Sequence, residues 1–289
     1  MSDPKPSDDS EPRAIARGSL LRVSAFFALV LMVVTGCTGG LGSMGRIGAL
    51  GPDEMLAASL ARLETSAAVH IEATFGGSVN AGSLSSLAGG LPIGLLGTLK
   101  LDGADANSDI DISDRAVHVS ASLPVLFGAT AEVILAGGDL YTKVNLLGDK
   151  FTKSKAPALP PLPSARPGAT FGFAEAVEQV RPLLEAAGAS ATMAARDQVG
   201  GRDTYRLGVT VTADGLNRIL ASAGVTVSLP AVRIGPVDYW IYADTLQPAR
   251  LRLTVTSTSI GSIDIDLVFS AYDRPVKIEA PPAGQVKSG

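Results

Sequence analysis

The chain has 289 residues, a formal net charge of −4 and one cysteine. Without a basic excess, nucleic acid is not an expected partner, and a single cysteine excludes an internal disulfide framework or a cysteine-rich metal site. Hydrophobic residues make up 46% of the chain but aromatic residues only 5%. We therefore expect one large domain whose core is aliphatic, built mainly from Val, Leu, Ile and Ala.

The N-terminal segment, residues 1–36, has the features of a lipoprotein signal peptide. Three arginines precede a charge-free apolar run over residues 23–34. A run of about a dozen residues is too short to span a bilayer comfortably, but it suits a signal peptide. Residues 33–37 (VVTGC) have the pattern of a lipobox, which is cut before its cysteine. An uncleaved membrane anchor and a secreted protein with a free thiol are the alternatives.

Cys37 is the predicted lipidation site. Two or more acyl chains hold a protein stably at a bilayer, so we expect a lipid-anchored protein on the extracytoplasmic face of the cell membrane. Residues 37–51 are rich in glycine and are predicted to form a flexible tether with an end-to-end distance of roughly 20 Å. A phosphate-binding loop is the alternative, but no strand precedes this segment and no Gly-Lys-Ser/Thr follows it.

Residues 52–280 are predicted to form a single domain that begins with a helix over 52–64. Proline starts this helix and acidic residues follow in its first turn, as the helix dipole favours. From residue 69 onward apolar residues recur at every second position, which is typical of strands with one buried and one wet face. Turns rich in Gly, Pro, Asp and Asn separate these runs and predict a large antiparallel sheet. The runs cover 69–75, 116–121, 133–135, 140–144, 204–211, 237–243, 250–255 and 262–270.

Two later segments, 171–187 and 213–223, carry apolar residues at helical spacing. Helices on the apolar side of an antiparallel sheet give an α+β architecture. The apolar, Gly-rich stretch 84–99 is predicted to be either a strand pair in the core or a mobile lip at the mouth of a cavity. The proline-rich stretch 156–168 is expected to be a stiff connection, and residues 281–289 a flexible tail.

Few residues are arranged for catalysis. His70 and His118 both fall at polar positions of their strands, so we expect them to face solvent. The repeated triplets 109–111 and 264–266, both Asp-Ile-Asp, place two carboxylates on one strand face. A solvated strand face is the favoured interpretation, and acid–base catalysis by an exported hydrolase or cation binding is the alternative. The sequence shows no catalytic triad or nucleophile elbow, so we expect a protein that is not an enzyme and that holds no cofactor or metal.

The order of these elements resembles the mycobacterial LppX/LprG lipoprotein family across nearly the whole mature chain. A lipobox, a small-residue tether, a helix and a first strand beginning at 66–71 (SAAVHI) follow one another. After an Ala/Glu-rich helix come 198–207 (QVGGRDTYRL), a short helix, 239–241 (YWI) and 248–251 (PARL). The resemblance lies in pattern and order across the chain.

This resemblance implies a U-shaped antiparallel half-barrel with helices on its concave apolar face and a hydrophobic cavity between them. Members bind multi-acylated lipids or glycolipids there and carry them across the cell envelope, so a lipid-exporting membrane transporter is an expected partner. A structural or protein-interaction lipoprotein with a closed core is the alternative function. Candidate cavity-lining residues are Val69, Ile71, Phe75, Val117, Val119, Phe173, Val177, Val180, Leu184, Leu207, Val209, Leu216, Ile219, Leu251, Leu253, Val255, Ile263, Ile265 and Leu267. Candidate residues of the cavity-mouth loop are Leu87, Leu91, Ile93 and Leu95.

Overall fold

The computed structural model describes residues 50–82, 97–156, 181–182, 184–185, 187–212, 214–215, 232–258 and 261–287. The predicted signal peptide, Cys37, most of the tether and most of the proline-rich stretch lie outside these ranges. So do the candidate residues Phe173, Val177, Val180, Leu216 and Ile219, and all four candidates of the cavity-mouth loop. Statements about those residues stay predictions.

The predicted first helix is confirmed as α2, Pro52–Thr65. Proline stands at its start, and the Glu54 side chain accepts a hydrogen bond of 3.0 Å from the backbone N–H of Gly51. This contact satisfies one of the amide groups that a helix start leaves without a partner. The helix ends at Thr65, and the extended backbone of Ser66 leads directly into the first strand.

The predicted antiparallel sheet is confirmed, and thirteen of its strands are described. Its order is β7-β6-β5-β4-β3-β1-β13-β12-β11-β9-β8, with β2 paired to β1 and β10 paired to β12. The strands are β1 Ala68–Asn80, β2 Thr98–Lys100, β3 Ala104–Asp111, β4 Ala116–Leu123, β5 Ala129–Ala136, β6 Asp139–Val144, β7 Thr152–Lys155, β8 Ser190–Val199, β9 Arg202–Thr210, β10 Val232–Ile234, β11 Val237–Tyr242, β12 Pro248–Ser257 and β13 Gly261–Ser270.

Sequence alternation did not predict β2, β3, β7, β8 or β10, although the triplet 109–111 at the end of β3 was placed on a strand face. The longest of them, β8, stands at one end of the sheet order, and eight of its ten residues are exposed, the exceptions being Ala191 and Val199. A strand without a buried face needs no apolar alternation, because its pairing with β9 comes from backbone hydrogen bonds.

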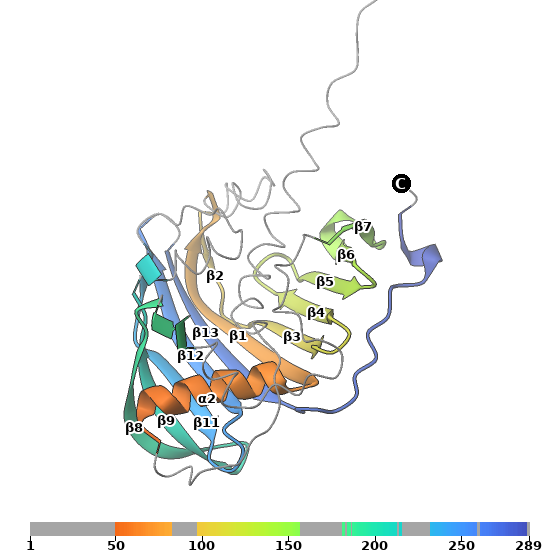
Figure 1. Cartoon of the computed structure of the whole chain (residues 1–289). Coiled ribbons are helices and arrows are strands. Elements are labelled where there is room, and N and C mark those ends of the chain that lie inside the picture. Colours follow the sequence, from red (N-terminus) through yellow and green to blue (C-terminus); the bar gives the residue numbers. More distant parts are fainter. Residues whose placement is uncertain are drawn as a thin grey trace, which may run out of the picture.

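Figure 1 shows the sheet bent into a U, with α2 lying across its concave side. The helix packs there through Leu63 against the apolar side chains of β1 and through Met55 and Leu56 against β9 and β11. The described part of the chain is therefore an α+β half-barrel with a helix on its apolar face, as predicted. Of the two later predicted helices, only residues 181–187 in part and 214–215 are described, and they are helical.

The segment expected to be a flexible tail is bound to the sheet as far as Lys287. Phe151, just before β7, pairs with Val286, and the Lys287 N–H donates to the Phe151 carbonyl at 2.8 Å. Ile278 and Val286 pack on a small cluster that contains Ile134. The prediction of a free tail is wrong for residues 281–287, because the otherwise open edge beside β7 offers backbone partners.

Among the described residues, no helix combines the length and the hydropathy that crossing a membrane requires.

Candidate functional site

The candidate site is the concave side of the sheet, here called the apolar face and defined as the face on which α2 lies. Strand register aligns the apolar residues of neighbouring strands. Ile71 of β1 stands opposite Phe269 of β13, and Leu251 of β12 stands opposite both Leu267 and Tyr239. Because side chains alternate between faces along a strand, this register turns separate apolar runs into one continuous surface.

The structure brings every described lining candidate onto this face. Each belongs to, or packs against, one of the clusters that contain residues of α2. Leu184 reaches the same region through contacts with Ala57 and Ala61 of the helix. The other members are Val69, Ile71, Phe75, Val117, Val119, Leu207, Val209, Leu251, Leu253, Val255, Ile263, Ile265 and Leu267.

Burial on the apolar face decreases from Val69 to Phe75 on β1 and from Phe269 to Ile263 on β13. On β1, Val69 is fully buried, Ala73 is 8% exposed, and Phe75 is only partly buried. On β13 the exposed fraction rises in the same direction, from 3% at Phe269 to the partly buried Ile263. The helix thus closes one end of the face as packed core, while Phe75 and Ile263 farther along the strands keep part of their surface accessible. Beyond them, at the far end of β1, Val79 is 1% exposed and belongs to a second buried cluster.

Two polar contacts fix α2 on the face. The Asp53 carboxylate accepts a hydrogen bond of 2.6 Å from the backbone N–H of Ala191 in β8. The Ser59 and Tyr239 hydroxyls lie 3.0 Å apart in the buried interface with β11. Burial raises the pKa of the Tyr239 phenol well above its ordinary value, so this hydroxyl keeps its proton and contributes a neutral hydrogen bond.

The apolar face carries no charge on the strands that form it. All described residues of these strands that face α2 are uncharged. They lie in β1 (69–75), β3 (104–110), β4 (117–123), β5 (129–135), β9 (205–209), β11 (237–241), β12 (251–255) and β13 (263–269). What this face offers is apolar area, which binds apolar ligands.

The opposite side of the sheet, here called the polar face, holds the acid pair of 264–266 in ion pairs. Asp266 accepts hydrogen bonds from Arg250 and from Arg252, the latter at 2.8 Å. Burial alone raises the pKa of Asp266, but these two guanidinium groups outweigh it and hold the pKa below its ordinary value. Asp264 accepts a hydrogen bond of 2.6 Å from the Thr254 hydroxyl. The favoured interpretation of this pair as a strand-face feature agrees with these contacts.

Trp240, the single tryptophan of the chain, lies on the polar face among arginines. The guanidinium carbons of Arg206 and Arg250 lie 5.2 and 5.6 Å from its ring centre. Its indole N–H donates to Asp197 at 3.0 Å, and this hydrogen bond is the main reason why the pKa of Asp197 is lowered. This stacking was not predicted from the sequence, because its members come from four different strands.

Both histidines lie on the polar face, at the register predicted for them, and each has a carboxylate partner. His70 Nδ1 lies 2.7 Å from Asp109, and His118 Nε2 lies 3.1 Å from Glu132. Their side chains are 26% and 38% exposed, so they are more covered than a free surface position. Within the described ranges, no group of three or more His, Cys, Asp and Glu residues is arranged to hold a metal ion.

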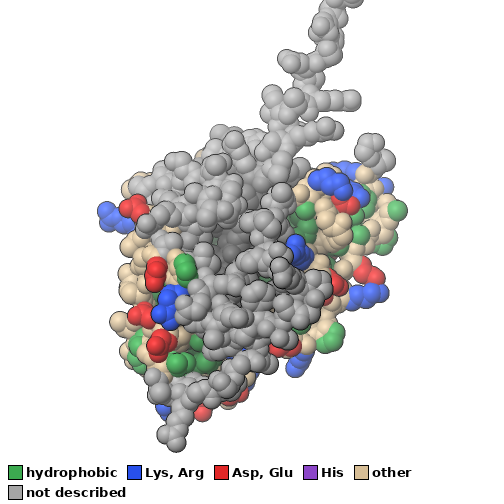
Figure 2. Space-filling model, viewed as in Figure 1, with side chains coloured by type: hydrophobic (Ala, Val, Ile, Leu, Met, Phe, Trp, Pro, Cys, Tyr) green, Lys and Arg blue, Asp and Glu red, His purple; other side chains and the backbone are tan. Residues whose placement is uncertain are grey.

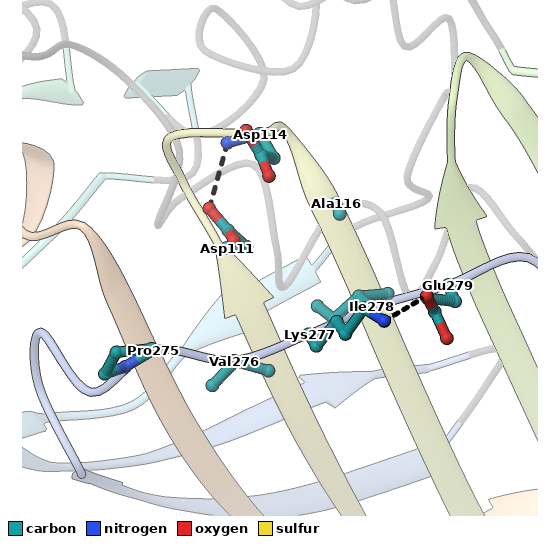
Figure 3. A pocket seen from close by; sticks show the side chains of 8 residues that line it. All are labelled: Asp111, Asp114, Ala116, Pro275, Val276, Lys277, Ile278 and Glu279. Carbon is teal, nitrogen blue, oxygen red and sulfur yellow. Dashed lines mark hydrogen bonds and ion pairs between the residues drawn. The ribbon is translucent and has the colours of Figure 1, made fainter.

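A pocket of about 330 Å³ lies between the β3–β4 turn and the chain that follows β13. Figure 3 shows Asp111 and Asp114 on one side of it and residues 275–279 on the other. Lys277 and Glu279 form an ion pair at 2.6 Å, and Asp111 accepts the Asp114 N–H at 2.9 Å. With charged residues in its wall, this pocket does not suit an acyl chain, and it is separate from the apolar face.

Charges of both signs are mixed on the outside of the molecule. In Figure 2 the described Lys, Arg, Asp and Glu side chains lie in small groups on the two sides of the view. Mixed signs produce no long-range field that would steer one class of charged partner.

Comparison with known proteins gave similar structures but no similar sequences. No family model matches the chain, and no curated protein matches it. One similar solved structure is that of the Mycobacterium tuberculosis lipoprotein LppX, with 16% identity and a TM-score of 0.44 over 78% of this chain and 98% of that one. LprF from Mycobacterium bovis has 15% identity and a TM-score of 0.43, over 80% of this chain and 99% of the other. LppX and LprF are members of the family that the sequence resembles.

A third similar structure is a LolA superfamily protein from Nitrosomonas europaea. It has 10% identity and a TM-score of 0.26, over 83% of this chain and 99% of the other.

Proposed function

We propose that this protein is a membrane-anchored lipoprotein that binds an acylated lipid or glycolipid on its apolar face and carries it across the cell envelope. The proposed function involves no enzymatic step. The observation that supports it most is the incomplete burial of the apolar face beyond α2, from Phe75 and Ile263 across Leu253 and Val255. In a closed core, side chains of this kind are fully buried.

The energetics of an acyl chain suit this surface. Each methylene that leaves water contributes about 0.8 kcal/mol, so ten of them contribute about 8 kcal/mol. The longest strand, β1, has 13 residues, and at about 3.4 Å per residue it is longer than one acyl chain needs. Because the described positions of the face are uncharged, no charged side chain loses its hydration when the chain binds.

Only some of the candidate lining residues have surface that a bound lipid could contact. Val69 and Leu207 are fully buried beneath α2, so they support the helix and have no free surface for a ligand. Phe75, Leu253, Val255 and Ile263, which lie farther along the strands, have accessible area. We therefore place the lipid chains there, with the headgroup toward solvent.

The proposed anchor is Cys37, acylated after signal-peptide cleavage. It would hold the half-barrel within reach of the bilayer that supplies its cargo. A lipid-exporting transporter in the same membrane is the proposed source or recipient of the lipid, since an acylated lipid does not cross water unaided at a useful rate.

A matched pair of variants tests the site. Phe75→Lys places a charge on the apolar face, whereas Thr74→Lys places the same residue on the polar face of the same strand, next to Asp105 and Asp266. Full-length protein is purified from membranes of its native host and extracted with organic solvent, and the extract is analysed by mass spectrometry. We expect stoichiometric acyl lipid with the wild type and with Thr74→Lys, and a large loss with Phe75→Lys.

Thermal unfolding of each variant separates loss of lipid from loss of fold. If Phe75→Lys does not fold, Phe75→Ser provides a milder change at the same position. Absence of lipid from the folded wild type would contradict the proposal and favour the closed-core interaction protein. Equal lipid content in the two lysine variants would place the ligand elsewhere.

A further inference from the structure

Three large apolar side chains stand exposed together at one end of the sheet. Phe127 is 81% exposed, Leu146 56% and Leu147 49%. Phe127 belongs to the turn between β4 and β5, and the two leucines form the short helical turn after β6. Asn145 joins the two turns, because its amide donates to the Gly128 carbonyl at 3.1 Å and accepts from the Thr130 N–H at 2.9 Å. We call this group the apolar tip.

The backbone of the tip holds Phe127 outward in an unfavourable conformation. Phe127 has a φ of 57°, in the left-handed region that bulky residues avoid, and Gly128 follows with a φ of 71°. The turn is fixed by hydrogen bonds from Gly128 N–H to the Pro124 carbonyl at 3.2 Å and from Ala129 N–H to the Leu126 carbonyl at 3.0 Å. A strained backbone conformation of this kind persists only where the surrounding structure holds it, and such residues cluster at functional sites.

The tip lies at the end of the sheet opposite to the start of β1, beyond the partly buried Phe75. β4 ends and β5 begins at this end of the sheet. Across β3 and β4, the strand pairing places Phe75 of β1 near the same end, because Phe75 stands opposite the first residue of β3. Val125 and Leu126, from the same turn as Phe127, pack against a cluster that includes Val79 and has Ile263 beside it. The exposed side chains therefore continue the apolar face outward into solvent.

The size and composition of the tip fit a bilayer better than a protein. Three partly exposed side chains offer on the order of 400 Å² of apolar surface, and a stable protein interface buries about 800 Å² on each partner. Residues 124–129 (PVLFGA) and 145–148 (NLLG) contain no charge, so their entry into the lipid interface removes no ion from water. Phe and Leu are side chains that insert at the boundary between headgroups and acyl chains.

We propose that the apolar tip is a membrane-docking site, at which Phe127, Leu146 and Leu147 insert into the bilayer and set this end of the sheet against the lipid. The proposal rests on the proposed function, since it assumes that the chain is tethered by Cys37 and takes up lipid. A tether of about 14 residues keeps the domain within roughly 20 Å of the membrane. Docking by the tip then fixes which end of the half-barrel faces it.

Tryptophan fluorescence in vesicles tests the insertion. Phe127→Trp is a conservative change, and Trp240, the only natural tryptophan, is 4% exposed on the polar face and serves as the internal reference. Ser113→Trp, in the exposed β3–β4 turn at the opposite end of the strands, is the matched control. Full-length protein is reconstituted into vesicles of phosphatidylethanolamine and phosphatidylglycerol, with and without brominated acyl chains.

We expect brominated lipid to quench the fluorescence of the tryptophan introduced at position 127. The fluorescence of Ser113→Trp and of the wild type should stay unchanged. An unquenched indole at position 127 overturns the proposal, and so does equal quenching at position 113. Combining Phe127→Trp with Phe75→Lys excludes quenching by a bound cargo lipid. Quenching that disappears in this combination also overturns the docking site.

Lipid transfer between vesicles supplies a second readout. The double variant Leu146→Ser, Leu147→Ser is expected to slow transfer about tenfold, which corresponds to 1.4 kcal/mol of lost interfacial binding. Its extracted lipid content should equal that of the wild type. An unchanged transfer rate contradicts docking by the tip even if the protein carries lipid, whereas quenching at position 127 without any bound lipid contradicts only the proposed function.

Discussion

At the scale of single residues, neighbouring residues of one strand face opposite sides of the sheet and make different contacts. On β12, Leu251 and Leu253 face α2, and Arg250 and Arg252 bind Asp266 on the polar face. The arginines also lie over the ring of Trp240. This ladder of charges keeps the outer side of a long sheet hydrated and paired, while the inner side stays free of charge.

The ion pairs of Asp266 make stability depend on pH. Because Arg250 and Arg252 hold the pKa of Asp266 below its ordinary value in the folded protein, the carboxylate stabilises the fold above its unfolded pKa of about 3.9. That contribution is lost as the pH falls through the lower, folded pKa. We expect Asp266→Asn to reduce the free energy of unfolding by roughly 1–2 kcal/mol at pH 7. Unfolding by denaturant at several pH values measures it.

The difference between the wild type and Asp266→Asn should shrink as the pH falls below about 4 and vanish once the wild-type carboxylate is protonated. A difference that stays constant down to the most acidic pH would show that the effect of the substitution does not come from the charge. The matched variant Asp238→Asn breaks the ion pair between Asp238 on β11 and Arg206 on β9. It compares a carboxylate bound by one arginine with one bound by two.

At the scale of elements, α2 determines which part of the apolar face is closed. Its first turn is attached to β8 through Asp53, its middle to β11 through Ser59, and its last turn packs through Leu63 at the start of β1. A helix held at three points covers one end of the strands and leaves Phe75 and Ile263 only partly buried.

Asp53→Ala should loosen the N-terminal end of α2. The substitution leaves the Ala191 N–H without its acceptor and removes a negative charge from the first turn of the helix, so we expect a loss of about 1–3 kcal/mol in the free energy of unfolding. Hydrogen exchange of the Ala191 amide should become faster. Glu54→Ala, which removes only the helix-capping contact to Gly51, is the control and should leave the Ala191 amide protected. Equal exchange rates in both variants would contradict the role given to Asp53.

Sequence periodicity predicted those elements in which one face is buried. β1, β9, β12 and β13 follow from alternation alone, and the start of α2 follows from Pro52 and the acidic residues after it. The edge strand β8 could not be predicted, because its side chains are exposed on both faces. The partner of Asp266 could not be predicted either, since Arg250 is 16 residues away in sequence and only the register of β12 on β13 brings them together.

At the scale of the whole molecule, the sheet forms a U with α2 inside it, and the last described residues close the edge beside β7. The fold class was predictable because a two-sided sheet with an aliphatic face needs helices to cover that face. The extent of coverage was not, because the same Val, Leu and Ile pattern suits a filled core and an accessible face. The decrease in burial from Val69 to Phe75 is a property of the packed structure only.

Cys37→Ala should detach the protein from the membrane or stall its processing. The lipobox pattern makes this cysteine the acceptor of the acyl chains, and alanine cannot be acylated. Membrane fractionation and the intact mass of the protein measure the effect, and Thr38→Ala, which keeps the cysteine, is the control. Membrane retention and a mass that differs only by the substitution would show that residues 33–37 are not a lipobox.

The central claim is that the apolar face holds a lipid. Native mass spectrometry of the full-length protein, purified from host membranes in a mild detergent, measures the ligand directly as a non-covalent addition to the protein mass. We predict one such addition, which disappears on denaturation, yields acyl chains on fragmentation, and is retained in Thr74→Lys but lost in Phe75→Lys. A native mass equal to that of the lipidated chain alone, in a preparation shown to be folded, would contradict the claim.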